Sequence, residues 1–117
     1  MTPSVVYSGA ERAWLQEHVR QAALLGGWLY YHTYDSRKSP EGFPDVLALR
    51  GEQLIVAELK SEGKDPTLAQ QKWLAAFRIL EALLPDHISV YVWRPGDLAD
   101  IDRSLLGKRT AVQPRPG

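Results

Sequence analysis

The 117-residue sequence predicts a single α/β domain in which a mixed β-sheet is flanked by helices. Two apolar runs, residues 46–49 and 54–60, are joined by a short turn that contains a glycine, which predicts a β-hairpin. A helical pattern lies between this hairpin and a further strand, so we expect the two flanking strands to be parallel and joined by a right-handed crossover. The hydrophobic content of 44% is sufficient for one core.

The elements expected before the hairpin are a helix, a strand and a polar loop. Ser8 followed by Glu11 has the spacing of a capping box and predicts the start of the helix, which a pair of glycines ends. The apolar positions of this helix are Trp14, Leu15, Val19, Ala22 and Ala23. Residues 28–33 are rich in aromatic side chains and favour a strand, and the polar residues 34–42 favour a loop.

The elements expected after the hairpin are a helix, a strand and a second, shorter helix. Thr67 and Gln70 form another capping-box pattern, and the helix that they open should run to about Leu84, before Pro85. Its apolar face consists of Trp73, Leu74, Phe77, Leu80 and Leu84. The pattern then predicts a strand at residues 87–93, a helix at 97–106 and a flexible tail at 108–117, outside a domain of residues 1–107.

Composition excludes several classes of protein. The chain carries 14 basic and 14 acidic residues, so any affinity for nucleic acid must come from local patches rather than from bulk charge. The absence of cysteine excludes a disulfide framework and a cysteine-based zinc site. Because no apolar run has transmembrane length and residues 1–9 lack a leader pattern, we expect a soluble, cytoplasmic protein that does not act at a membrane.

The hairpin should bring two carboxylates together. Its register sets Asp45 opposite Glu58, and like charges at directly opposed positions destabilise a sheet. A divalent cation such as Mg²⁺ would compensate them, because it binds carboxylate oxygens together with water and substrate phosphate. Lys60 falls on the same face as Glu58. Each of these features alone is more typical of a solvated strand face, but their combination indicates a nuclease metal site.

These residues resemble the VRR-NUC domain of the PD-(D/E)XK nuclease superfamily, in the stand-alone form typical of phage and bacterial genomes. The resemblance covers residues 8 to about 106 and implies a restriction-endonuclease-like fold with an αβββαβ core. It also implies cleavage of DNA phosphodiester bonds with Mg²⁺ or Mn²⁺ and without an organic cofactor. The motif residues are Glu11, Ser36-Arg37, Ser39, Gly42-Phe43-Pro44-Asp45, Glu58-Leu59-Lys60, Gln70 with Trp73, and Val90-Tyr91-Val92-Trp93-Arg94-Pro95.

The resemblance also implies roles for the central residues. Asp45 and Glu58 would be the metal ligands, together with the backbone carbonyl of Leu59. Lys60 would orient or activate the attacking water and help to neutralise the developing charge on the phosphorane.

Two supporting residues have alternative roles. Glu11 would approach the metal through water, and Gln70 would hold the site from the second helix. Both could instead serve only as capping-box partners, Glu11 for Ser8 and Gln70 for Thr67.

The expected substrate is DNA, in particular branched DNA such as a four-way junction. Arg37, Lys38 and Lys64 are the candidate DNA contacts, because they flank the hairpin in the chain. A chain of this size offers a duplex little surface, so we expect a homodimer that acts on two strands. Two alternatives stay open, a sequence-specific or nicking endonuclease of the same superfamily and a non-catalytic DNA-binding subunit that retains the fold.

Overall fold

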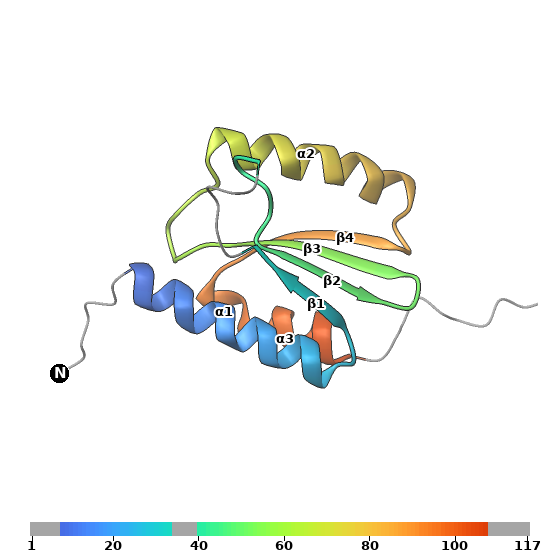
Figure 1. The fold of residues 1–117 in the computed structure, drawn as a ribbon, viewed down its shortest axis with the longest axis horizontal. Coiled ribbons are helices and arrows are strands. Elements are labelled where there is room, and N and C mark those ends of the chain that lie inside the picture. Colours follow the sequence, from blue (N-terminus) through green and yellow to red (C-terminus); the bar gives the residue numbers. More distant parts are fainter. Residues whose placement is uncertain (1–7, 34–39, 108–117) are drawn as a thin grey trace, which may run out of the picture.

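The computed structural model, which describes residues 8–33 and 40–107, has a four-stranded mixed sheet flanked by helices (Figure 1). This architecture confirms the predicted α/β class. The predicted DNA contacts Arg37 and Lys38 and the tail 108–117 lie outside the described residues. Within the described ranges no helix is long and apolar enough to span a membrane. The elements are α1 Ser8–Leu25, β1 Leu29–His32, β2 Val46–Arg50, β3 Gln53–Leu59, α2 Leu68–Leu83, β4 Ile88–Trp93, the 3₁₀ turn η2 Pro95–Asp97 and α3 Leu98–Leu106.

The sheet has the strand order β1-β2-β3-β4, in which the hairpin and the parallel pair agree with the sequence analysis. The antiparallel pairing of β1 with β2 was not predicted. Strands β2 and β3 are antiparallel with Val46 opposite Ala57, a register that continues to Asp45 opposite Glu58. Arg50 pairs with Gln53, so the hairpin loop contains two residues, a length that gives the predicted register. Strands β3 and β4 are parallel, as the helix between them predicts.

The main core lies between the sheet and the two helices α1 and α3, on the lower side of the sheet in Figure 1. Helix α1 buries one stripe, Leu15, Val19, Ala22 and Ala23. The expectation that Trp14 belongs to this apolar face is wrong, because 49% of Trp14 is exposed. Its ring lies against that of His18, with 6.2 Å between the ring centroids.

Helix α2 covers the opposite face of the sheet but buries little of its own surface (Figure 1). Only Leu74 is buried, and Phe77 packs at the edge of a small cluster with Val56 and Val90. The predicted apolar face was therefore too wide, because Leu80 and Leu84 are 42% and 46% exposed. Since α2 packs over β4 at the margin of the sheet, the strands cannot cover these two residues.

Two side chains of α2 cap the outer edge of β4. The backbone N–H of Val90 donates to Glu81 Oε2 at 2.9 Å, and Arg78 Nη1 donates to the Val90 carbonyl at 3.4 Å. The carbonyls of His87 and Trp93 instead point towards β3, where they accept hydrogen bonds from the backbone N–H groups of Leu54 and Lys60. Because backbone groups alternate in direction along a strand, the polar groups of Val90 point away from β3. Helix α2 thus binds the edge of the sheet as well as its face.

Candidate active site

The segment before β2 is fixed to the start of α2 by a close backbone approach. Gly42 has φ of 84°, and a Cβ there would lie 2.4 Å from the carbonyl carbon of Ala69. The ring of Phe43 packs edge-on against Trp73, with 4.9 Å between the ring centroids. Trp73 Nε1 donates to the carbonyl of Glu41 at 3.1 Å. The sequence Gly42-Phe43 therefore permits α2 to contact the chain just ahead of the carboxylate pair.

The same segment is also bound to β1. Thr33 donates through its N–H to the carbonyl of Asp45 at 2.9 Å and through its hydroxyl to the carbonyl of Pro44 at 3.0 Å. These bonds continue the pairing of β1 and β2 by one residue. They place Asp45 at the start of β2, where its buried side chain faces Glu58 across the hairpin.

Both carboxylate oxygens of Asp45 accept hydrogen bonds. Arg12 Nη2 on α1 donates to Oδ1 at 3.0 Å, and the backbone N–H of Leu59 donates to Oδ2 at 2.9 Å. The Arg12 side chain is 43% exposed, so the guanidinium reaches Asp45 from the molecular surface. The sequence analysis did not select Arg12. The only feature of the sequence that could have indicated Arg12 is its position one residue after Glu11, in the first turns of the helix.

Glu58 is fully buried, and neither of its carboxylate oxygens has a hydrogen-bond partner among the described residues. Burial and, after it, the negative charge of Asp45 together raise the pKa of Glu58 to about 8, against the opposing charge of Lys60. Lys60 Nζ lies 3.8 Å from Glu58 Oε2, and the Lys60 side chain is 14% exposed. Without a bound metal ion, Glu58 is therefore a neutral carboxylic acid at pH 7.

This arrangement fits a hard divalent cation. The described residues contain no cluster of three or more His, Cys, Asp or Glu side chains suited to a metal. Two carboxylates are nevertheless sufficient for Mg²⁺, which keeps several waters and binds substrate phosphate. This fit is favoured by the absence of hydrogen-bond partners for both Glu58 oxygens among the described residues, because a buried carboxyl group normally forms hydrogen bonds.

His32 on β1 is a buried neighbour of the site. Gln16 Nε2 on α1 lies 3.5 Å from His32 Nδ1. Burial lowers the pKa of His32 and Arg12 lowers it further, whereas the charge of Asp45 opposes both. The imidazole is therefore neutral at pH 7 and adds no positive charge beside Asp45.

The supporting residues of the predicted site make contacts of their own. Glu11 Oε1 accepts the backbone N–H of Glu62 at 2.9 Å, so it fixes the loop that follows β3. Gln70 completes the capping box, since its Oε1 accepts the N–H of Thr67 at 2.8 Å and its own N–H donates to Thr67 Oγ1 at 3.2 Å. The capping role of Gln70 is thus observed, and its role in holding the site from α2 stays a prediction.

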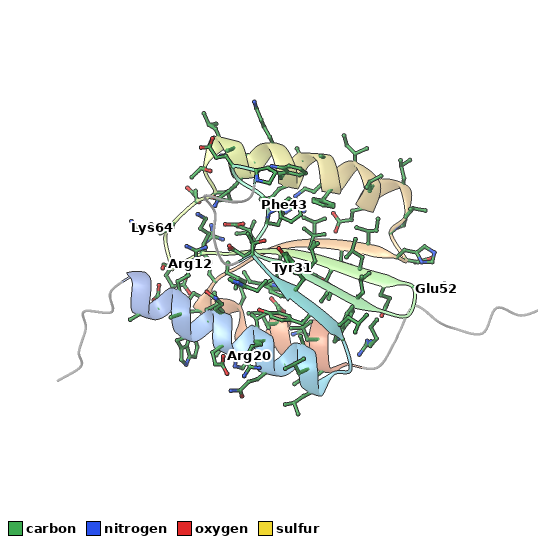
Figure 2. All side chains as sticks on the ribbon, viewed as in Figure 1. Arg12, Arg20, Tyr31, Phe43, Glu52 and Lys64 are labelled. Atoms are coloured by element: carbon green, nitrogen blue, oxygen red, sulfur yellow. The ribbon has the colours of Figure 1, made fainter. Side chains whose placement is uncertain are left out.

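Lys64 lies in the exposed loop between β3 and α2. Figure 2 shows Lys64 and Arg12 at the same end of the molecule, with Glu52 of the hairpin turn at the other. Arg94 holds the loop, because its Nη2 and Nε donate to the Lys64 carbonyl at 2.6 and 3.1 Å. Sequence reasoning used Arg94 only as part of a motif and gave it no contact.

Comparisons of the chain with models of known protein families, with curated proteins and with solved structures found no match. The resemblance to VRR-NUC domains therefore rests on the motif residues in the sequence. The structure contributes a mixed α/β fold and the arrangement of Asp45, Glu58, Lys60 and Arg12 at one end of the hairpin.

Proposed function

We propose that this protein is a metal-dependent DNA endonuclease with a restriction-endonuclease-like fold, related to the VRR-NUC domains. The observation that carries the proposal is the fully buried Glu58, whose oxygens lack hydrogen-bond partners in the described part of the chain and which lies opposite Asp45. Burial of such a carboxyl group beside a second carboxylate opposes folding unless a ligand compensates it. A phosphodiesterase metal site supplies that compensation and explains the adjacent Lys60.

The residues that would hold Mg²⁺ or Mn²⁺ are Asp45, Glu58 and the backbone carbonyl of Leu59. When bound, such an ion polarises the scissile phosphate and lowers the pKa of a coordinated water. Glu58 would have to lose its proton to solvent in order to act as a ligand, so metal binding should release about one proton and tighten as the pH rises towards 8. Lys60, beside Glu58, orients the attacking water and neutralises charge that develops on the phosphorane.

Arg12 and Glu11 act from α1. Arg12 neutralises Asp45 in the metal-free protein, and its half-exposed guanidinium can bind a DNA phosphate once a cation compensates Asp45. Glu11 positions the loop after β3 through Glu62. The water-mediated contact of Glu11 with the metal and the contribution of Gln70 remain part of the proposal.

The proposed substrate is branched DNA, cut by a homodimer. A net charge of zero favours recognition through local contacts, for which Arg37, Lys38 and Lys64 are the candidates. Lys64 is exposed at the same end of the molecule as Arg12, which supports a DNA path across that end (Figure 2).

Cleavage of end-labelled DNA tests the proposal. Linear, flapped and four-way-junction substrates are incubated with Mg²⁺, Mn²⁺ or EDTA, and the natural protein is compared with Asp45→Asn and Lys60→Ala. Asp86→Asn is the matched control, because Asp86 is exposed and precedes the start of β4, away from the site. We expect metal-dependent paired nicks in the junction that both site variants lose and the control retains.

The other outcomes separate the alternatives. Cutting at mapped positions in linear DNA would indicate a sequence-specific or nicking endonuclease with the same chemistry. DNA binding without cleavage under every metal condition, by a protein that still binds Mn²⁺ in calorimetry, would indicate a non-catalytic subunit. Full activity of folded Lys60→Ala would refute the role given to Lys60.

A further inference from the structure

Helix α2 presents an apolar stripe to solvent, on the side opposite its buried residue Leu74. Residues at intervals of three and four positions share one face of a helix, and here that face points away from the sheet. All of its members are exposed, and Leu68, Ile79 and Leu83 are exposed by 79%, 64% and 70%. The stripe, which we call the outer stripe, consists of Leu68, Lys72, Ala75, Ala76, Ile79 and Leu83.

The outer stripe is self-complementary about its midpoint. Reversal of the helix about the point between Ala75 and Ala76 exchanges Leu68 with Leu83 and Lys72 with Ile79. A contact with two-fold symmetry requires this property, because residue i of one copy meets residue j of the other and the same pair recurs with the copies exchanged. The alanines at the centre allow two helices to approach closely, and the aliphatic stem of Lys72 can cover an isoleucine while its ammonium stays in water.

We propose that the outer stripe is the contact surface between two copies of this chain, with their α2 helices packed antiparallel. The stripe runs along the whole 16-residue helix, about 24 Å. The exposed side chains of Leu80 and Leu84 flank it and extend the apolar area. A helix pair of this length lies near the lower limit of specific interfaces, about 1,200 Å² in total, so we expect a dimer that dissociates at micromolar concentration.

The proposal identifies the contact of the expected homodimer, and it stands independently of nuclease activity. Each α2 would carry the dimer contact on its outer side and the Gly42 segment at its N-terminus. Since the helices run antiparallel, the two candidate active sites would lie at opposite ends of the helix pair. An inactive protein could still form this dimer, so a failed cleavage assay would not contradict the proposed dimer contact, which is tested separately.

Sedimentation velocity over a concentration series provides the first test. In the proposed register Ile79 lies opposite Lys72 of the partner. Ile79→Lys should therefore raise the dissociation constant at least tenfold, whereas Ile79→Glu, which can pair with that lysine, should raise it less. Leu25→Lys on α1 is the matched control, because Leu25 is 79% exposed and lies outside the outer stripe. We expect the control to dimerise as the natural protein does.

Cysteine cross-linking provides the second test, because the natural chain contains no cysteine. Under mild oxidation, a mixture of Ala75→Cys and Ala76→Cys proteins should form disulfide-linked dimers within minutes, and Leu25→Cys should not. Circular dichroism establishes that each variant is folded. A natural protein that stays monomeric at 100-fold the concentration expected for dimerisation, or a dimer that Ile79→Lys leaves intact, would overturn the proposal. If the natural protein is monomeric, the outer stripe would instead be a binding surface for a different protein.

Discussion

Replacement of Glu58 by Gln should stabilise the metal-free protein, and the gain should grow with pH. The ordinary pKa of a glutamate is 4.5, and that of Glu58 is raised to about 8 by burial and by Asp45. Between these values the unfolded chain has lost the Glu58 proton while the folded protein retains it, so the free energy of unfolding falls as the pH rises. The full difference is about 5 kcal/mol above pH 8 and about 3 kcal/mol at pH 7.

Urea denaturation at intervals between pH 5 and pH 9 in EDTA measures this effect. The natural protein should lose stability across the window, with a slope of up to about 1.4 kcal/mol per pH unit relative to Glu58→Gln. His32, whose pKa is lowered, changes stability in the opposite direction near its own pKa, and the comparison at each pH cancels it. Parallel profiles for the natural protein and Glu58→Gln would refute the claim that a buried carboxyl group titrates here.

Three further substitutions test the surroundings of the site. Arg12→Ala should tighten Mn²⁺ binding several-fold in calorimetry because it removes the cation that competes at the carboxylate, and tighter binding by the control Arg20→Ala would contradict this reasoning. Gly42→Ala should lower the free energy of unfolding by roughly 1–3 kcal/mol more than Gly27→Ala in urea denaturation, because both glycines have positive φ but only Gly42 meets backbone atoms. Gln70→Ala should cost about 1 kcal/mol of stability, and Gln70→Glu should restore the cap but not the cleavage rate; recovery of cleavage would leave Gln70 with a capping role alone.

Local patterns predicted the carboxylate pair and the strand order around it. A short turn between two apolar runs fixes the register of a hairpin, and loops of two or four residues both set Asp45 opposite Glu58. The position of Lys60 on the same face as Glu58 then follows from the alternation of side chains along the strand. The parallel pairing of β3 and β4 was predictable because a helix separates them in the chain.

Contacts between distant segments could not be predicted in this way. The contact between Arg12 and Asp45 spans 33 positions and depends on how α1 docks on the sheet, which no local spacing specifies. The bond from the Glu62 backbone to Glu11 has the same origin. A helical apolar pattern likewise does not say how much of its apolar face a sheet covers, and for this reason the predicted apolar face includes Leu80, which is 42% exposed.

The capped edge of β4 has a consequence for solubility. An exposed edge strand offers unpaired N–H and C=O groups to strands of other molecules and thereby promotes aggregation. Here Glu81 and Arg78 already occupy the outward groups of Val90, so an incoming strand would first have to displace two charged side chains. Two residues that join a helix to a sheet therefore also hinder the addition of a strand at this edge, and their loss should appear as aggregation on storage before it appears as a change in fold.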